Sequence, residues 1–387
     1  MAFSISVPKK QLQNYLINRS FLVQKAESVH EVLEKLKCIQ VDPINVVVRS
    51  HELALWNRVK DFRLQDLSTH LYKNRSLFEY WLQLFSIIPT IYYPYLYHRM
   101  KTGGRWQKEF SKKYAKEITK TLMFIEGHGV TGSKELLHIP TSGSLLSWSD
   151  SSRTAVLEYL WDRGKIMIHH REKNQKFYDL TQRVLSEEII KQSVSKERSL
   201  EFFLESAFDY TGILRRSFAT HVTHRLGYVD TFAVGDLWSR WISTGKIIEL
   251  TVPEVKTKYY LLRRQLEELK RSGKAAQHEG LNILSPLDPL IIDRQILKDF
   301  FDFNYTWEAY MPPAKRKFGY YGMPILDHGK FVGQVDARKN KKGRVEVVKM
   351  EIDNKDREAK RRTLGVLGDI EEFVAGEKSY REQEDSF

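Results

Sequence analysis

In the middle of the chain the spacing of apolar residues changes from the period of a helix to the period of a strand. From Ser151 to Asp162 the apolar positions lie on one face of a helix, and Arg163-Gly164-Lys165 then ends the pattern. Ile166–His169 has the period of a strand, 171–176 is a polar, basic turn, and Phe177–Leu180 is a returning strand. The pattern predicts a helix followed by a β-hairpin.

The same order recurs about eighty residues later. Asp236–Ile242 is helical in pattern, Thr244-Gly245-Lys246 ends it, and Ile247–Leu250 with Lys258–Leu262 forms a second hairpin. A helix followed by a two-stranded wing is the outline of a winged helix-turn-helix. The sequence therefore predicts two such modules in tandem.

A third copy is predicted nearer the N-terminus, although its wing is not obvious. Ser28–Lys37 would form one helix, the residues around Gln40 a turn, and Pro43–Val59 the recognition-type helix.

Beyond residue 275 strands are expected to dominate up to Ile352, and a charged helix to follow Asp353. We therefore expect an α+β chain with four segments: a helical, winged-helix region at 1–125, winged-helix modules at 126–195 and 196–275, and a β-rich domain with a terminal helix at 276–387.

Composition suggests the partner. The chain of 387 residues carries 62 Lys and Arg against 49 Asp and Glu, a net charge of +13, which favours a polyanion such as DNA. It has one cysteine, Cys38, and lacks a leader or an apolar run long enough to span a membrane. We expect a cytoplasmic monomer without membrane contact, since no heptad pattern indicates dimerisation.

Cofactor sites are not indicated. The His169-His170 doublet lies on a predicted strand, where neighbours face opposite sides, so no metal is expected. Residues 127–132 satisfy Gly-x-Gly-x-x-Gly, but a dinucleotide site needs a preceding strand, whereas Phe110–Thr121 has the pattern of an amphipathic helix.

The most informative stretch is Gln40-Val41-Asp42, followed by Pro43. An amide and a carboxylate two residues apart face the same space from an extended turn, and Val41 can anchor the backbone. The alternative is structural: Asp42 would cap a helix that starts at Pro43.

Basic residues interleaved with aromatics mark the last third. Lys315, Arg316 and Lys317 precede Tyr320, and 338–344 holds five cations in seven residues. Such runs suit phosphate contacts and base stacking, whereas a solvated strand turn explains the second run equally well.

These motifs together resemble the AlkZ/YcaQ family of bacterial DNA glycosylases. The matching stretches are Gln40-Val41-Asp42, the helix residues up to Arg58, Phe78–Pro89, Leu287–Arg294, Pro312–Tyr321 and Gly333–Asp336. The resemblance implies a C-shaped fold of tandem winged helices around a basic DNA channel, with Gln40 and Asp42 as the catalytic pair. Gln83 stands where the family pattern leads us to expect a histidine.

The resemblance also implies a reaction, namely monofunctional release of N7-alkylated purines and the unhooking of interstrand crosslinks, without a cofactor. Asp42 would stabilise the cationic sugar, in an exposed position within an open groove that also admits crosslinked bases. Either Asp42 or Gln40 would position the attacking water, and Gln40 could contact the sugar instead. The predicted contacts with double-stranded DNA are Asn45, Arg49, His51, Arg58, Arg153, Arg171, Lys173, Lys315, Arg316, Lys317 and Tyr320.

Other functions also fit a basic winged-helix chain. The main alternative is a non-catalytic transcriptional regulator, because fold and charge would suit it equally well. An RNA-binding protein is less favoured, since no RNP-like aromatic motif occurs.

Overall fold

The computed structural model describes residues 3–138, 150–225, 231–353 and 355–384. The chain folds into two compact units. Unit 1 comprises Met1–Leu67, Glu205–Ala219 and Gly235–Phe387, and unit 2 comprises Ser68–Leu204 and Thr220–Val234. The four-segment division at residues 125, 195 and 275 stays a prediction.

The elements of the first half are, in chain order, β1 Ser4–Ser6, α1 Lys9–Arg19, α2 Val29–Leu36, β2 Ile39–Gln40, α3 Ser50–Arg58, α4 Leu64–Ser68, η1 Thr69–Lys73, β3 Leu77–Leu82, β4 Leu84–Pro89, η2 Thr90–Tyr92, α5 Tyr93–Thr102, α6 Arg105–Lys113, α7 Ala115–His128, η3 Glu135–His138, α8 Asp150–Asp162, β5 Ile166–Glu172 and β6 Gln175–Leu180. Those of the second half are α9 Thr181–Val184, α10 Glu187–Lys191, α11 Lys196–Thr211, α12 Arg216–Arg225, α13 Thr231–Ser243, β7 Ile247–Thr251, β8 Tyr259–Leu262, η4 Arg263–Gln265, α14 Leu266–Ser272, β9 Leu281–Ile283, α15 Arg294–Phe301, η5 Pro313–Lys315, β10 Met323–Asp327, β11 Lys330–Lys339, β12 Val345–Ile352 and α16 Arg357–Glu384.

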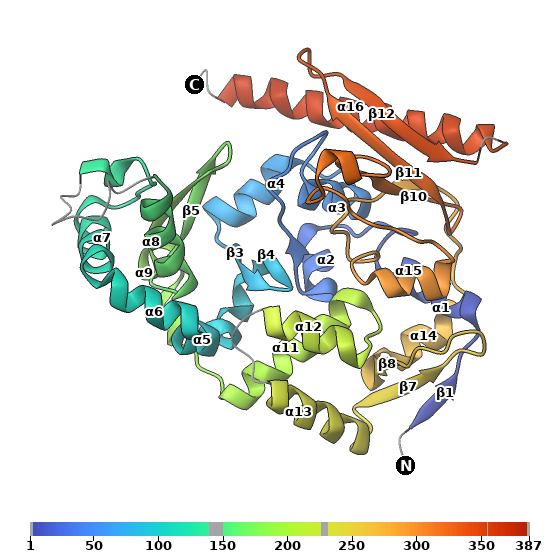
Figure 1. The fold of residues 1–387 in the computed structure, drawn as a ribbon, viewed down its shortest axis with the longest axis horizontal. Coiled ribbons are helices and arrows are strands. Elements are labelled where there is room, and N and C mark those ends of the chain that lie inside the picture. Colours follow the sequence, from blue (N-terminus) through green and yellow to red (C-terminus); the bar gives the residue numbers. More distant parts are fainter. Residues whose placement is uncertain (1–2, 139–149, 226–230, 354, 385–387) are drawn as a thin grey trace. The chain divides into compact units, whose positions relative to one another are not determined.

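Unit 1 contains an antiparallel four-stranded sheet in the order β12-β11-β10-β9. The long helix α16 runs along this sheet (Figure 1). The predicted strands near the C-terminus and the charged terminal helix are thus both present. A second sheet has the order β1-β7-β8, in which β1 and β7 pair in parallel. The sequence pattern did not predict this N-terminal strand.

The core of the four-stranded sheet extends to the segment that follows Gln40 and Asp42. Val47, Val48 and Leu53 are buried in one apolar cluster with Tyr321 and Val335. The backbone joins in, because the Lys339 N–H donates to the Val46 carbonyl at 2.8 Å. The sheet therefore holds the turn that carries the candidate catalytic residues.

In unit 2 the predicted helix at 151–162 is α8, and the predicted hairpin is β5 with β6. The predicted turn at 171–176 is too long, since both strands extend and only Lys173 and Asn174 connect them. Thr131 forms a bridge with Tyr178 and so adds a short third strand. The sequence order is helix α7, bridge, η3, α8 and hairpin.

The same order recurs with α11, a bridge between Leu214 and Tyr260, α12, α13 and the hairpin β7–β8. Gly164 and Gly245 follow α8 and α13 with φ of +62° and +68°, the left-handed conformation that ends helices. The predicted helix and hairpin are therefore present in both copies.

Three predicted elements are wrong. No helix starts at Pro43, since α3 begins at Ser50. The helix predicted across 110–121 is interrupted at Tyr114, between α6 and α7. Finally, α15 lies in the region expected to be strands, where Asp293 caps it by accepting from the Gln295 N–H.

Two smaller expectations concern the possible cofactor sites. A register shift between Ile168 and His170 brings the Nδ1 atoms of His169 and His170 to 2.9 Å, so the two rings do not face opposite sides as predicted. Among the described residues, no three His, Cys, Asp or Glu side chains gather where they could hold a metal. The Gly-x-Gly-x-x-Gly stretch begins within the last turn of helix α7 and does not follow a strand, so its setting differs from that of a dinucleotide site.

Candidate active site and DNA-contacting residues

Gln40 ends the short strand β2, and Asp42 lies two residues later in an extended turn. Both side chains are only 3% exposed. The expectation that Asp42 lies exposed in an open groove is therefore wrong. Pro43 and Asn45 next to it are exposed, so the carboxylate is buried within one residue of the surface.

Asp42 is not a helix cap. Its Oδ1 accepts a hydrogen bond from the Ile44 N–H at 2.9 Å, which makes a local turn well before α3 starts at Ser50. The cap of α3 is supplied instead by Glu52, whose carboxylate accepts from the Arg49 N–H at 3.0 Å. This geometry removes the structural alternative that the sequence left open.

The remaining oxygens of the pair have no partner. Asp42 Oδ2 and Gln40 Oε1 are buried, and neither accepts a hydrogen bond from any residue that the structure describes. A buried oxygen without a donor costs free energy, and natural proteins retain such groups mainly where function needs them. These two oxygens are therefore free to accept hydrogen bonds from a bound molecule.

The Asp42 carboxyl is shielded from water and lies near two tyrosines. Burial raises the pKa of its carboxyl above the ordinary value, and the Ile44 N–H opposes this only in part. Burial and the charge of Asp42 raise the pKa of Tyr321 well above that of a free phenol, and the same two causes raise the pKa of Tyr310. Both tyrosines belong to the aromatic and basic stretch of the last third, although neither is among the predicted DNA contacts.

Helix α3 is fixed behind this turn by polar contacts with the end of β9 and the segment that follows it. Arg58 makes a bidentate ion pair with Asp288 at 2.6 and 2.8 Å, and both side chains are fully buried. Asn57 donates to the Ile283 carbonyl at 3.0 Å, and Ser50 to Ser285 at 2.8 Å. The motif residues on α3 and at 285–288 therefore hold the scaffold of the site.

Comparison with known proteins identifies the family. The sequence matches the family described as DNA glycosylase AlkZ-like over residues 33–368. This chain belongs to that family. The glycosylase fold also resembles the solved structure of Streptomyces sahachiroi DNA glycosylase AlkZ, with a TM-score of 0.63 and 14% sequence identity, covering 89% of this chain and 91% of that one.

The family settles the class of protein. The chain is a DNA glycosylase with a mixed α and β fold, and DNA is its substrate. The non-catalytic regulator, which fold and charge alone could not exclude, is not retained. No helix among the described residues is long and apolar enough to cross a membrane.

In unit 1 of the glycosylase, not all the residues predicted to contact DNA are exposed. Arg58 was predicted to contact phosphate and is instead an internal ion pair, because Asp288 neutralises it in the core. His51 is buried at 7% exposure, and Arg49 is partly buried with Nη1 3.5 Å from Glu52. Asn45 is exposed.

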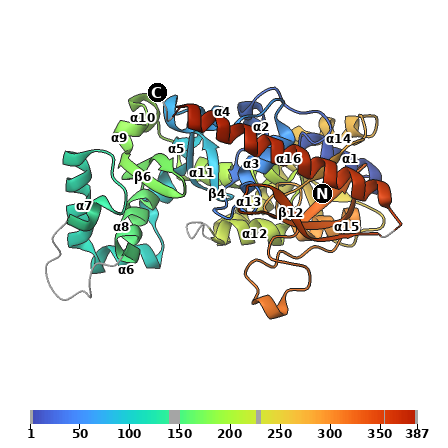
Figure 2. The same ribbon diagram turned by 90° about the horizontal axis from the view of Figure 1, so that it is seen from above.

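The predicted basic residues of the 313–320 loop are better placed for DNA. Lys315 and Lys317 are exposed, and Tyr320 is 40% exposed. Arg316 lies with its guanidinium 5.0 Å from the Tyr320 ring centroid and donates from Nε to the Met311 carbonyl at 2.9 Å. This orange loop extends away from the sheet in Figure 2.

In unit 2 the predicted contacts differ in accessibility. Lys173 is exposed at the tip of the hairpin, with φ +55°. Arg171 is held by Glu79, with Nε 2.9 Å from one carboxylate oxygen, and Tyr72 donates to the same carboxylate at 2.8 Å. Arg153 is 7% exposed, and Gln83 at the β3–β4 turn is 3% exposed.

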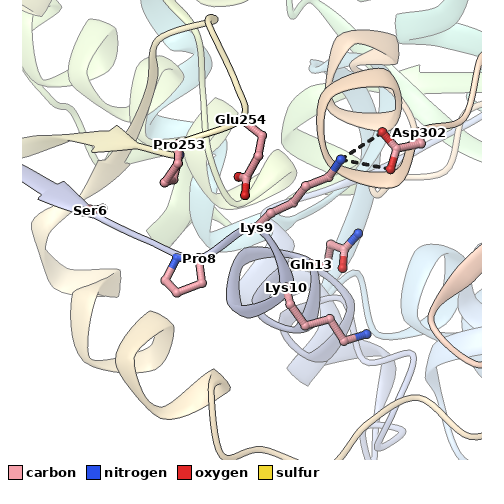
Figure 3. Close-up of a pocket in the computed structure, with 8 residues that line it drawn as sticks. All are labelled: Ser6, Pro8, Lys9, Lys10, Gln13, Pro253, Glu254 and Asp302. Carbon is pink, nitrogen blue, oxygen red and sulfur yellow. Dashed lines mark hydrogen bonds and ion pairs between the residues drawn. The ribbon is translucent and has the colours of Figure 1, made fainter.

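One pocket of the described structure is lined by neither Gln40 nor Asp42. It has a volume of about 570 Å³ and is lined by Ser6, Pro8, Lys9, Lys10, Gln13, Pro253, Glu254 and Asp302. Figure 3 shows that Lys9 spans it to reach both oxygens of Asp302, each at 2.9 Å. Neither of its carboxylates, Glu254 and Asp302, is among the buried groups without a partner, so this pocket does not share the feature that distinguishes Asp42.

Proposed function

We propose that the protein is a monofunctional DNA glycosylase that hydrolyses the N-glycosidic bond of N7-alkylated purines. In this reaction the bond from the base nitrogen to C1′ breaks, and its electron pair neutralises the cationic purine. Water then adds its oxygen to C1′ and loses a proton. The intermediate sugar resembles an oxocarbenium ion and is stabilised by a nearby anion.

The observation that carries the proposal is the pair of unpartnered buried oxygens on Gln40 and Asp42. In a site of low dielectric the ionised Asp42 stabilises positive charge on the sugar more strongly than it would in water. The Gln40 amide holds the water without competing for its proton, because an amide does not titrate at neutral pH. N7-alkylated purines leave readily, so a strong general acid is not required.

The approach of DNA has to uncover the carboxylate, because Asp42 is buried. We infer that the lesion reaches it past the exposed residues Pro43 and Asn45. A crosslinked base is harder to bring to Asp42 than a single adduct, because it stays attached to both strands during the approach. Release of a crosslinked strand is therefore part of the proposal to be tested separately.

Two winged-helix modules would supply the DNA-binding surface. Their support is the repeated order of helix, single bridge, two helical segments and hairpin, which is the element order of that motif. Lys173 at the first hairpin tip and the exposed Lys315 and Lys317 are the cations we propose as phosphate contacts.

The experiment is base release from a duplex that contains N7-methylguanine, followed by alkaline cleavage of abasic sites. Wild-type protein is expected to give strand scission only after alkali, and borohydride to trap no covalent complex. Asp42→Asn should lose scission by at least about a hundredfold, by comparison with the loss of one transition-state contact. Asp302→Asn removes an exposed carboxylate from the same unit and is the matched control.

Equal scission by wild type and Asp42→Asn would refute the catalytic assignment. A duplex crosslinked by a nitrogen mustard, analysed on a denaturing gel, tests unhooking in the same way. Failure on the crosslink with release of N7-methylguanine would restrict the proposal to single adducts.

A further inference from the structure

Tyr310 is a large aromatic side chain held in an exposed position. It is 82% exposed, although hydrogen bonds within its loop hold the backbone in place. The Glu308 carboxylate accepts backbone N–H groups of Lys317, Phe318 and Gly319 at 3.0, 2.8 and 3.2 Å, which closes the loop on itself. The exposure of Tyr310 is thus a consequence of a fixed loop conformation and not of a lack of structure.

A chain of ring contacts connects Tyr310 to the site. Its ring packs edge-on against Trp307 at 5.2 Å between centroids, and Trp307 packs against the buried Tyr321 at 6.1 Å. Tyr321 belongs to the core cluster that includes Val47 and Val48, just after Asp42. The loop therefore presents an aromatic ring beside the turn that carries the carboxylate.

The electrostatics agree with this placement. Burial and the charge of Asp42 raise the pKa of Tyr310, which places the ring within the field of that carboxylate. The face of an aromatic ring is electron-rich. A flat cation between such a ring and a carboxylate is attracted by both. An N7-alkylated purine is flat and carries a positive charge until its glycosidic bond breaks.

We propose that Tyr310 stacks on the alkylated base and distinguishes a cationic base from a neutral one. The inference rests on the proposed function and adds the residue that recognises the substrate's charge. Because the leaving base becomes neutral, the ring stabilises the bound substrate more than the departing product. Tyr310 therefore governs the affinity for the substrate and KM. Its presence leaves kcat unchanged or lowers it slightly.

The test compares binding of two duplexes that the enzyme cannot hydrolyse quickly. One contains N7-methylguanine on a 2′-fluorinated sugar, which is cationic, and the other contains 7-methyl-7-deazaguanine, which has the same shape and is neutral. Wild type should bind the cationic duplex more tightly. Tyr310→Ala should reduce that preference by roughly tenfold, the range of a desolvated cation–aromatic contact.

Two further variants separate charge recognition from a general loss of contact. Tyr310→Phe keeps the ring and should keep the preference, whereas Tyr97→Ala, which removes another exposed tyrosine (39% exposed) on α5, should leave it unchanged. Thermal unfolding should be the same for wild type and Tyr310→Ala. A preference retained by Tyr310→Ala, or equal weakening of both duplexes, would overturn the inference.

The excision assay keeps this result apart from the proposed reaction. Tyr310→Ala should raise KM for N7-methylguanine with kcat maintained, and Asp42→Asn should lose kcat. If Asp42→Asn proved fully active, the proposed chemistry would fail, whatever the binding preference shows. If only the preference were absent, the chemistry would stand and the role of Tyr310 would be refuted.

Discussion

Two buried carboxylates in this chain have opposite surroundings. Burial by itself raises the pKa of Glu79, but the charge and hydrogen bonds of Arg171 outweigh it, and the pKa lies below the ordinary value. Among the described residues Asp42 has one backbone donor and no ion pair, and burial raises its pKa. Glu79 is thus stabilised as an anion by the fold, whereas the fold disfavours the anion of Asp42.

This contrast predicts opposite effects of the same substitution on stability. Asp42→Asn removes a poorly solvated charge and should raise the free energy of unfolding by about 1 kcal/mol. Glu79→Gln leaves Arg171 without its buried anion and should lower that free energy by about 3 kcal/mol. Urea denaturation measures both. A loss of stability in both variants would indicate that Asp42 is a structural residue.

The raised pKa of Asp42 also predicts a pH dependence of activity. The ionised form is needed, so kcat/KM should fall as pH decreases through a folded pKa that is higher than the ordinary value of 3.8. Stability should change in the other direction. The folded state binds this proton more tightly than the unfolded state, so the penalty present above the folded pKa disappears as pH falls below the unfolded pKa.

The measurement is a pH profile of kcat/KM with N7-methylguanine DNA, together with urea denaturation across the same range. Residual activity of Asp42→Asn should lack the acidic limb. An acidic limb that persists in this variant would assign the ionisation to another group.

At the residue scale the sequence drew attention to Gln40 and Asp42 through their side-chain types and spacing, and their catalytic role stays a prediction. It could not reveal the internal role of Arg58, whose partner Asp288 lies 230 residues away. An arginine near a catalytic motif suits phosphate equally well until its partner is known. Tyr310 was visible as an aromatic in a basic loop, but its relation to Asp42 depends on the fold.

At the level of elements, the attachment of α3 to residues 285–288 determines where the Gln40 turn lies. Arg58→Met would leave Asp288 charged, buried and unpaired, and should lower the free energy of unfolding by about 3–5 kcal/mol. Lys60→Met removes an exposed cation just after the same helix and should change it by less than about 0.5 kcal/mol.

Urea denaturation tests this prediction, and DNA binding at several salt concentrations adds a second readout. Where Arg58→Met remains folded, its salt dependence should equal that of wild type, because the guanidinium contacts no phosphate. A reduced salt slope with unchanged stability would restore Arg58 as a DNA contact.

The elements that the sequence predicted correctly are those with a strong local period. The hairpins β5–β6 and β7–β8 follow helices that end at glycines, and both signals lie within a few residues. No helix starts at Pro43, because the Val46 carbonyl accepts a hydrogen bond from the Lys339 N–H at 2.8 Å and so pairs with a distant strand. The local sequence does not reveal this tertiary contact. The missed helix α15 had a usable signal, namely the cap Asp293 followed by Ile296, Leu297, Phe300 and Phe301.

On the scale of the whole molecule, the net charge of +13 correctly indicated a nucleic acid partner. The division into units was beyond sequence reasoning, since unit 1 gathers three separate stretches of chain. Local periodicity does not report which distant segments share a core.

Long-range charge gives a further prediction. Lys315→Gln together with Lys317→Gln removes two exposed cations, so the slope of log affinity against log salt should become shallower by about 2. The loss of affinity should be similar for damaged and undamaged duplexes, because phosphate contacts do not read bases. Fluorescence anisotropy at several salt concentrations measures it.

The control for this pair is Lys10→Gln with Lys330→Gln, which removes the same charge elsewhere on unit 1. A matching change in slope would mean that total charge, and not the loop, governs binding. No change in the Lys315 and Lys317 variant would remove the loop from the DNA surface.

The ion pair between Arg58 and Asp288 has a consequence for biosynthesis. Arg58 leaves the ribosome 230 residues before its partner, which at about 5–20 residues per second is a delay of roughly 10–50 s. During that time the nascent chain carries an arginine that has no anion to neutralise it and a turn without its supporting sheet. The catalytic turn should therefore be assembled late, and a ribosome-stalled chain that ends before residue 288 should release no base.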